Sequence, residues 1–156
     1  MDNAGFMRRA IELSRAKMDA GEGGPFGAVI AHRGSIVAEG WNRVTSTNDP
    51  TAHAEVVAIR RACEDLGTFR LDECEIYTSC EPCPMCLAAV YWAWLRVIYY
   101  GNTRDDAAAI GFDDSFLYDE IARPATQRTI PTRRLLEHEA MQAFRAWRDK
   151  PDKIAY

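Results

Sequence analysis

Two short motifs in the sequence place metal ligands next to an acidic residue. The first is His53-Ala54-Glu55, and the second is Pro82-Cys83-Pro84-Met85-Cys86. One imidazole and two thiolates, from His53, Cys83 and Cys86, supply three ligands for a tetrahedral zinc ion. Three protein ligands leave a fourth position for water, whereas a structural site more often closes with four. The pattern therefore predicts one catalytic Zn²⁺ per chain.

Glu55 stands two positions after His53, and the metal does not need it as a ligand. We expect Glu55 to shuttle protons, because it would take one from zinc-bound water, whose pKa the metal lowers to about 7. The hydroxide would attack a ring carbon, and Glu55 would deliver its proton to a ring nitrogen and help carry one to the departing amine. The combination H-x-E and P-C-x-x-C is typical of zinc enzymes that remove an amino group from a nucleobase by hydrolysis.

Parts of this pattern are compatible with other metal chemistry. A Cys-x-x-Cys pair alone also occurs in structural zinc sites and in redox pairs. Glu55 argues against a structural site, because such a site needs no acid beside an open metal position. Cys80 would extend the pair into an iron–sulfur run, but that run lacks its next cysteine, since position 90 is Val90. Catalytic zinc is therefore the preferred interpretation.

Composition and charge limit the remaining function classes. The 156-residue chain carries 19 basic and 23 acidic residues, and this balance argues against binding driven by nucleic-acid phosphates. The longest apolar run covers eleven residues, 85–95, whereas a membrane-spanning helix needs about 20. The five cysteines are an odd number, which excludes a complete disulfide framework. We expect a cytoplasmic protein in which Cys63, Cys74 and Cys80 are packing thiols, with Cys80 beside the site.

Hydrophobic periodicity predicts one domain, 1–156, in which helices and strands alternate. Helices are expected at 6–20, from the turn at 48–51 to 66, at 84–94, near 105–110 and at 137–148. Strands are expected at 27–32, 35–41, 75–79, 96–101 and 129–136. This order implies a central sheet with helices on both faces. The helix at 84–94 is almost wholly apolar, which predicts that it is buried.

Four segments of the chain carry a resemblance to a known family. They are residues 23–30 (GGPFGAVI), 48–55 (NDPTAHAE), 77–86 (YTSCEPCPMC) and 111–116 (GFDDSF). The chain resembles the bacterial guanine deaminases of the zinc-dependent cytidine-deaminase superfamily over nearly its whole length. The fourth segment, with 128–131 after it, is specific to the guanine branch. The resemblance implies a three-layer α/β/α sandwich around a central mixed five-stranded sheet, cytidine-deaminase-like in topology.

The resemblance also implies a reaction and a set of substrate contacts. Guanine would be converted to xanthine and ammonia, with attack at C2, the ring carbon that bears the amino group. The expected contacts with the substrate are Phe26 on the base, Asn42 and Asp114 on its polar edges, Ala54, Trp92 closing the pocket, and Tyr156. Taken from the residues alone, Asn42 is a turn residue at a strand end, Asp114 belongs to a capping or loop pair, and Trp92 is a core residue.

Members of this branch form homodimers in which the C-terminal segment, about 130–156, crosses to the other subunit. By resemblance, Tyr156 would cap the active site of the partner. Trp147 and Tyr156 are aromatic anchors that a solvated tail would not need. The expected partners are thus a small purine base and a second copy of the chain, without a membrane or a nucleic acid.

Three rival functions remain open at this point. The alternatives to guanine deamination are a deaminase of guanosine, a deaminase of cytosine or of adenosine in transfer RNA, and a zinc-binding module without activity. The Asp113-Asp114 pair also suits a nucleoside, so the sequence does not separate guanine from guanosine. The acidic net charge argues against transfer RNA.

Overall fold

The computed structural model describes residues 1–156 and divides the chain into two compact units. The first unit is Met1–Asp114 and the second is Ser115–Tyr156. No helix in the chain combines the length and apolarity that crossing a membrane requires.

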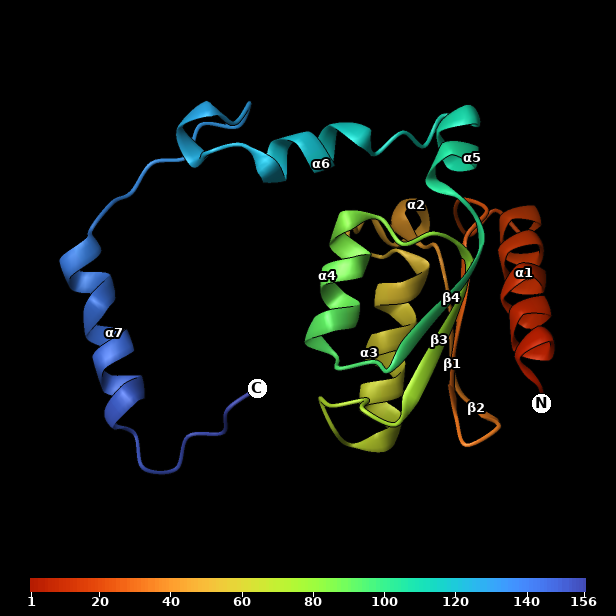
Figure 1. Cartoon of the computed structure of the whole chain (residues 1–156), viewed down its shortest axis with the longest axis horizontal. Helices are drawn as coiled ribbons and strands as arrows, with labels where there is room; N and C mark the ends of the chain where they lie inside the picture. The colour runs from red at the N-terminus through yellow and green to blue at the C-terminus, as the bar shows by residue number, and fades with distance from the viewer. The chain divides into compact units, whose positions relative to one another are not determined.

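A four-stranded sheet forms the centre of the first unit, in the order β2-β1-β3-β4 (Figure 1). The strands are β1 (Gly27–His32), β2 (Ser35–Trp41), β3 (Cys74–Cys80) and β4 (Val97–Asn102). Strand β1 pairs antiparallel with β2 and β3, whereas β3 and β4 run parallel. The sheet is mixed, as predicted, but it has four strands instead of five.

The predicted fifth strand at 129–136 is wrong. These residues form neither helix nor strand. The backbone N–H of Thr129 donates to the Glu120 carboxylate at 2.8 Å, Pro131 has no N–H to give, and Leu136 has a left-handed φ of 53°. Thr129 and Pro131 therefore offer no N–H to a neighbouring strand, and Leu136 leaves the extended conformation that a strand ladder requires.

Helices cover both faces of the sheet (Figure 1). Helix α1 (Asn3–Asp19) lies on one face, and α3 (Ala54–Leu66) and α4 (Pro84–Trp92) lie on the other. Residues of β1 alternate between the two cores: Val29 packs in the cluster of α1, and Ile30 packs in the cluster of α3. This alternation is the period of two that a strand buried on both faces requires. The first unit is therefore a three-layer α/β/α sandwich.

Four further helices and a 3₁₀ turn complete the chain. They are α2 (Val44–Thr47) and α5 (Arg104–Ala109) in the first unit, and α6 (Ser115–Ala122), η1 (Ala125–Gln127) and α7 (Glu137–Asp149) in the second. Thr103 starts α5 through a capping box with Asp106. Helices α2 and α6 are not among the helices predicted from the sequence.

Helix α4 corrects a prediction about burial. Cys86 and Val90 are buried, but Tyr91 is 76% and Trp92 is 67% exposed. The inner side of α4 packs on α3 and on the sheet, while its outer side bears these aromatic rings. An all-apolar sequence indicates that every side of a helix can be buried. It does not indicate that residues of the same chain cover every side.

Gly40 on β2 allows the sheet to approach the start of α3. A Cβ at this position would lie 2.1 Å from the Ala54 carbonyl oxygen and 2.6 Å from the Ala58 nitrogen. Only glycine therefore permits this distance between β2 and the helix that carries Glu55.

We expect Gly40→Ala to lower the free energy of unfolding by about 3 kcal/mol, because backbone must move to admit the methyl group. Urea unfolding measures the loss. Gly67→Ala is the matched control at the other end of α3, where φ is 62° and an added Cβ meets nothing within 4 Å. This control should cost only the backbone strain, about 1 kcal/mol. An equal or smaller loss at Gly40 would contradict the steric argument.

Candidate active site

The three predicted zinc ligands meet at the starts of two helices. His53 is the N-cap of α3, Cys83 is the N-cap of α4, and Cys86 lies in the first turn of α4. The Nδ1 atom of His53 lies 3.6 Å from Cys83 Sγ and 3.5 Å from Cys86 Sγ. All three ligand atoms lie within 4.8 Å of one another.

These distances fit a zinc ion. With Zn–S near 2.3 Å and Zn–N near 2.05 Å, a tetrahedral angle separates the nitrogen and the sulfur by about 3.6 Å. The observed separations agree with this value, and thiolate with imidazole is a donor set that zinc prefers. No fourth protein ligand belongs to the cluster. The residues therefore fit an open zinc site.

Shared protons connect the same side chains. Hydrogen bonds from Cys86 and His53 lower the pKa of the Cys83 thiol to about 4. The bond to Cys83 and burial raise the pKa of Cys86, and the bond to Cys83 raises the pKa of His53. A cation bound among these atoms would replace the shared protons, which is how metal binding releases protons from such clusters.

Glu55 is enclosed beside the ligands. It lies in the first turn of α3 and is only 6% exposed. Burial raises the pKa of its carboxyl group, because desolvation disfavours the charged form. The Thr78 hydroxyl lies 3.5 Å from Glu55 Oε1 and 2.9 Å from the Cys80 carbonyl oxygen, to which it donates. Glu55 is thus a carboxyl group that can hold or release a proton inside the protein.

A cavity of about 390 Å³ opens over this cluster, within the first unit. Its volume is in the range of small-molecule sites. The lining residues that the sequence predicted are Phe26, Asn42, His53, Glu55, Cys83 and Asp114. The cavity thus brings a metal cluster, an acid, an aromatic ring and two polar side chains together.

Asn42 presents a defined group to the cavity. Its Oδ1 accepts hydrogen bonds from the backbone N–H of Gly24 at 3.3 Å and of Val44 at 3.2 Å. Since both bonds end on the oxygen, the amide NH₂ remains for a ligand, and NH₂ only donates. Asp114 provides the opposite polarity, and burial raises the pKa of its carboxyl group.

Comparison with known proteins adds to this geometry. Residues 1–102 match the model of the cytidine and deoxycytidylate deaminase zinc-binding region. The chain belongs to this deaminase family. It therefore carries the zinc-binding domain of the family, and His53, Cys83 and Cys86 are the residues arranged to hold the metal.

Relatives within the deaminase family share different amounts of the chain. Guanine deaminase of Bacillus subtilis is 53% identical over 156 residues, 100% of both chains. Its X-ray structure matches with a TM-score of 0.97 over 100% of this chain and 99% of that one. A guanine deaminase structure from Nitrosomonas europaea has a TM-score of 0.70 at 36% identity and covers 80% of this chain and 69% of that one. A tRNA-specific adenosine deaminase of Agrobacterium fabrum is 44% identical over 105 residues, 67% of this chain and 68% of its own length.

Phe112 is a cavity residue that the sequence analysis did not single out. Its ring meets Phe26 edge to face, with centroids 4.9 Å apart and an angle of 90° between the planes. Both rings line the cavity. The available signal was its place in the segment 111–116, where only Asp114 was given a role.

Two predicted substrate contacts, Ala54 and Trp92, do not line the cavity. Ala54 is fully buried at the start of α3, and Trp92 is exposed on α4. Tyr156 belongs to the second unit and is 76% exposed.

Cys80 does line the cavity, but its Sγ lies 3.6 Å from the Thr103 carbonyl oxygen, and burial raises its pKa to about 11. It is a neutral thiol beside the ligand cluster.

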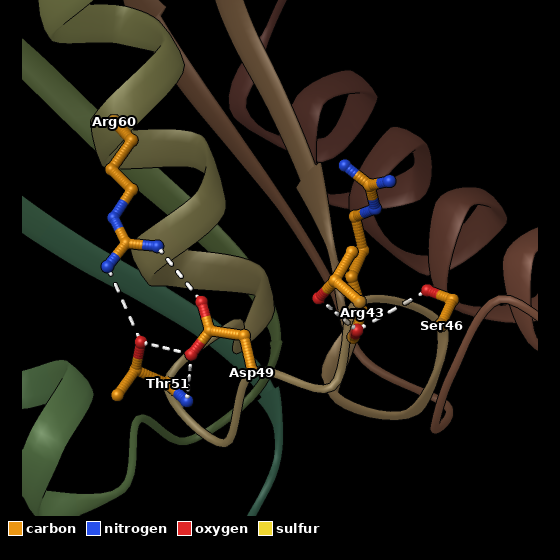
Figure 2. A network of polar contacts seen from close by, with 6 residues as sticks. Arg43, Ser46, Asp49, Thr51 and Arg60 are labelled. Atoms are coloured by element: carbon orange, nitrogen blue, oxygen red, sulfur yellow. Dashed lines mark hydrogen bonds and ion pairs between the residues drawn. The ribbon is translucent and has the colours of Figure 1, made fainter.

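Asp49 shapes the turn that leads into His53. Figure 2 shows its carboxylate between Thr51 and Arg60. Oδ1 accepts from the backbone N–H of Thr51 at 2.8 Å and from the Thr51 hydroxyl at 2.7 Å, while Oδ2 lies 3.5 Å from Arg60 Nη1. The N–H of His53 then donates to the Thr51 carbonyl oxygen at 2.8 Å. The bonds to Asp49 therefore fix the backbone that orients the imidazole.

We expect Asp49→Ala to weaken zinc binding by about tenfold, in line with the effect of removing groups that support metal ligands. Competition with a chromophoric chelator measures the affinity. Asp49→Asn is the matched control, because its amide oxygen still accepts from Thr51, and it should bind zinc as the wild type does. Wild-type affinity in Asp49→Ala would show that the turn does not depend on this carboxylate.

Proposed function

We propose that this protein is a zinc-dependent guanine deaminase, which converts guanine and water to xanthine and ammonia. The observation that carries the proposal is the position of buried Glu55 beside the ligand cluster, in the wall of a cavity that also holds Phe26 and Asn42. A zinc site with a purely structural role has no use for a carboxyl group enclosed beside an open metal position.

His53, Cys83 and Cys86 would hold the zinc ion. When bound, zinc supplies a Lewis-acid centre that makes water reactive at neutral pH. Two thiolates balance the metal's charge, and both helix starts favour negative charge at this point. The three ligands thus leave one coordination position open, and their charges stabilise the bound metal.

Glu55 would move the protons of the reaction. It takes one from the attacking water, passes it to a ring nitrogen next to C2, and helps deliver a proton to the amino group as the C2–N bond breaks. A carboxyl group whose pKa is raised by burial suits both the accepting and the donating step.

The remaining cavity residues would orient the base. Phe26 offers an aromatic wall on which a purine ring can stack. The Asn42 NH₂ would donate to a purine acceptor, and the Asp114 carboxylate would accept from N–H groups on the guanine edge. Guanine has acceptors and donors on one ring system, so a site with both polarities suits it.

The relatives support guanine, and not transfer RNA, as the substrate. Similarity to the Bacillus guanine deaminase extends through both units, whereas the tRNA-specific deaminase of Agrobacterium matches over 105 residues. The net charge of −4 also disfavours a substrate held through its phosphates. All five cysteines are free, which accords with the cytoplasmic location that we propose.

Ammonia release from guanine, guanosine, cytosine and adenine tests the proposal directly. We expect guanine to give the highest kcat/KM. Glu55→Gln should lower that value by about 10²–10⁴-fold, because it removes the proton carrier, and it should keep one zinc per chain. If guanosine or another compound is the better substrate, guanine is the wrong assignment. Full activity in Glu55→Gln would exclude the role given to Glu55.

We also propose that the working unit is a homodimer in which the segment of about 130–156 is exchanged. Each unit bears an exposed aromatic surface of its own. Tyr91 and Trp92 form one on α4, and Phe144, 73% exposed, with Trp147, 46% exposed, forms another on α7. Apolar surfaces of this kind mark interaction sites. In the proposed dimer Tyr156 caps the cavity of the other chain.

Removal of residues 153–156 should lower guanine turnover without loss of zinc, since the ligands all lie in the first unit. Steady-state kinetics and metal analysis measure the two quantities, and analytical ultracentrifugation reports the oligomeric state. Tyr156→Ala in the full-length chain separates the ring from the rest of the tail. Unchanged turnover after truncation would rule out a capping role.

A further inference from the structure

The loop of residues 21–26, between α1 and β1, fits closely against the end of β2. At Gly23 a Cβ would lie 2.1 Å from the Asn42 carbonyl oxygen, so no side chain fits there. The Asn42 N–H donates to the Phe26 carbonyl oxygen at 3.0 Å, and Gly24 donates to Asn42 Oδ1. The position of this loop therefore determines where Phe26 and Asn42 stand in the cavity wall.

Trp41 and Glu22 fasten this loop from outside the cavity. The indole Nε1–H of Trp41 donates to Glu22 Oε2 at 2.6 Å, and Lys17 Nζ donates to Oε1 at 3.0 Å. The bonds from Lys17 and Trp41 lower the pKa of Glu22, so it is charged at neutral pH. None of these three residues lines the cavity. Glu22 immediately precedes Gly23, and Trp41 immediately precedes Asn42.

Two cations hold the indole ring in place. Lys17 Nζ lies 4.0 Å and Arg61 Cζ lies 4.3 Å from the ring centroid of Trp41. Arg61 is itself fixed, because its Nη1 donates to the Glu39 carbonyl oxygen at 2.8 Å. Cations are attracted to the face of an indole more strongly than to any other aromatic side chain. Trp41 thus connects α1, β2 and α3 and has little freedom to move.

We propose that Trp41 and Glu22 are positioning residues for substrate binding. Their hydrogen bond sets the loop, and the loop sets Phe26 and Asn42, although neither Trp41 nor Glu22 touches the substrate. The inference rests on the proposed guanine deaminase function. Small displacements of a group that orients a substrate cost much of its effect. The zinc ligands lie at the starts of α3 and α4 and not in this loop, so the loss should fall on substrate binding and not on the metal.

Two variants remove this hydrogen bond from opposite sides. Trp41→Phe keeps an aromatic ring beneath the cations, and Glu22→Ala removes the acceptor. Both should raise KM for guanine by about tenfold with kcat within about threefold of wild type, at unchanged zinc content. Glu22→Gln should keep KM within about twofold, because its amide oxygen still accepts from the indole.

Glu39→Gln is the matched control on the same strand. It removes the ion pair in which Arg9 Nε lies 2.6 Å from Glu39 Oε1, and it leaves the loop of residues 21–26 untouched. The melting temperature should fall in this variant while KM stays at the wild-type value. A melting temperature lowered in Trp41→Phe or Glu22→Ala without a change in KM would assign these residues to the scaffold alone and overturn the proposal.

Amide hydrogen exchange tests the same inference without using activity. Residues 21–26 should exchange faster in Trp41→Phe and in Glu22→Ala than in the wild type, because local opening becomes easier. Unchanged exchange in this loop overturns the positioning role. If the wild-type protein releases no ammonia from guanine, the proposed function fails, and the exchange result alone decides whether the loop is fastened as inferred.

Discussion

Two helices must begin at one point for a single imidazole and two thiolates to meet. Helix α3 begins after His53 and α4 begins after Cys83. The partial positive charge of both helix N-termini points at the ligand cluster, and without the thiolates it would disfavour a cation there. Thiolates reverse that balance, because they are stabilised by the helix starts and in turn attract the metal. Gly40 allows β2 to lie close to the start of α3, and the Asp49 turn fixes the backbone from which His53 projects.

The residues proposed to recognise the substrate lie on different elements from the metal ligands and Glu55. The ligands and Glu55 lie at helix starts, whereas Phe26 and Asn42 lie where strands begin and end, and Asp114 closes the first unit. A change of preference can therefore occur in loops and strand ends while the metal cluster stays intact. Proteins named for guanine and for adenosine in transfer RNA are both similar to this chain, over 100% and 67% of its length.

Local sequence was sufficient wherever the structure depends on neighbours along the chain. The strands Gly27–His32 and Ser35–Trp41 were predicted with their correct bounds because Arg33 and Gly34, both with positive φ, separate them, and the ligand motifs are short enough to read directly. Features that depend on distant partners were not visible. Thr129 and Ile130 have strand-forming side chains, yet the backbone of Thr129 bonds to Glu120 instead of to a neighbouring strand. The bond between Trp41 and Glu22 joins residues that are 19 positions apart and that no motif connects.

Strand order in the sheet also has a consequence for how the protein folds. The hairpin of β1 and β2 is local, whereas β3 pairs with β1 across the intervening helix α3, and β4 joins β3 through the crossover helix α4. Contacts between distant segments form late because they carry a larger loop-closure entropy. His53 precedes β3 and the two cysteine ligands follow it, so the ligands converge only when that strand is in place. Small zinc modules fold around their metal, whereas in this chain the metal would fasten a sheet that has already assembled.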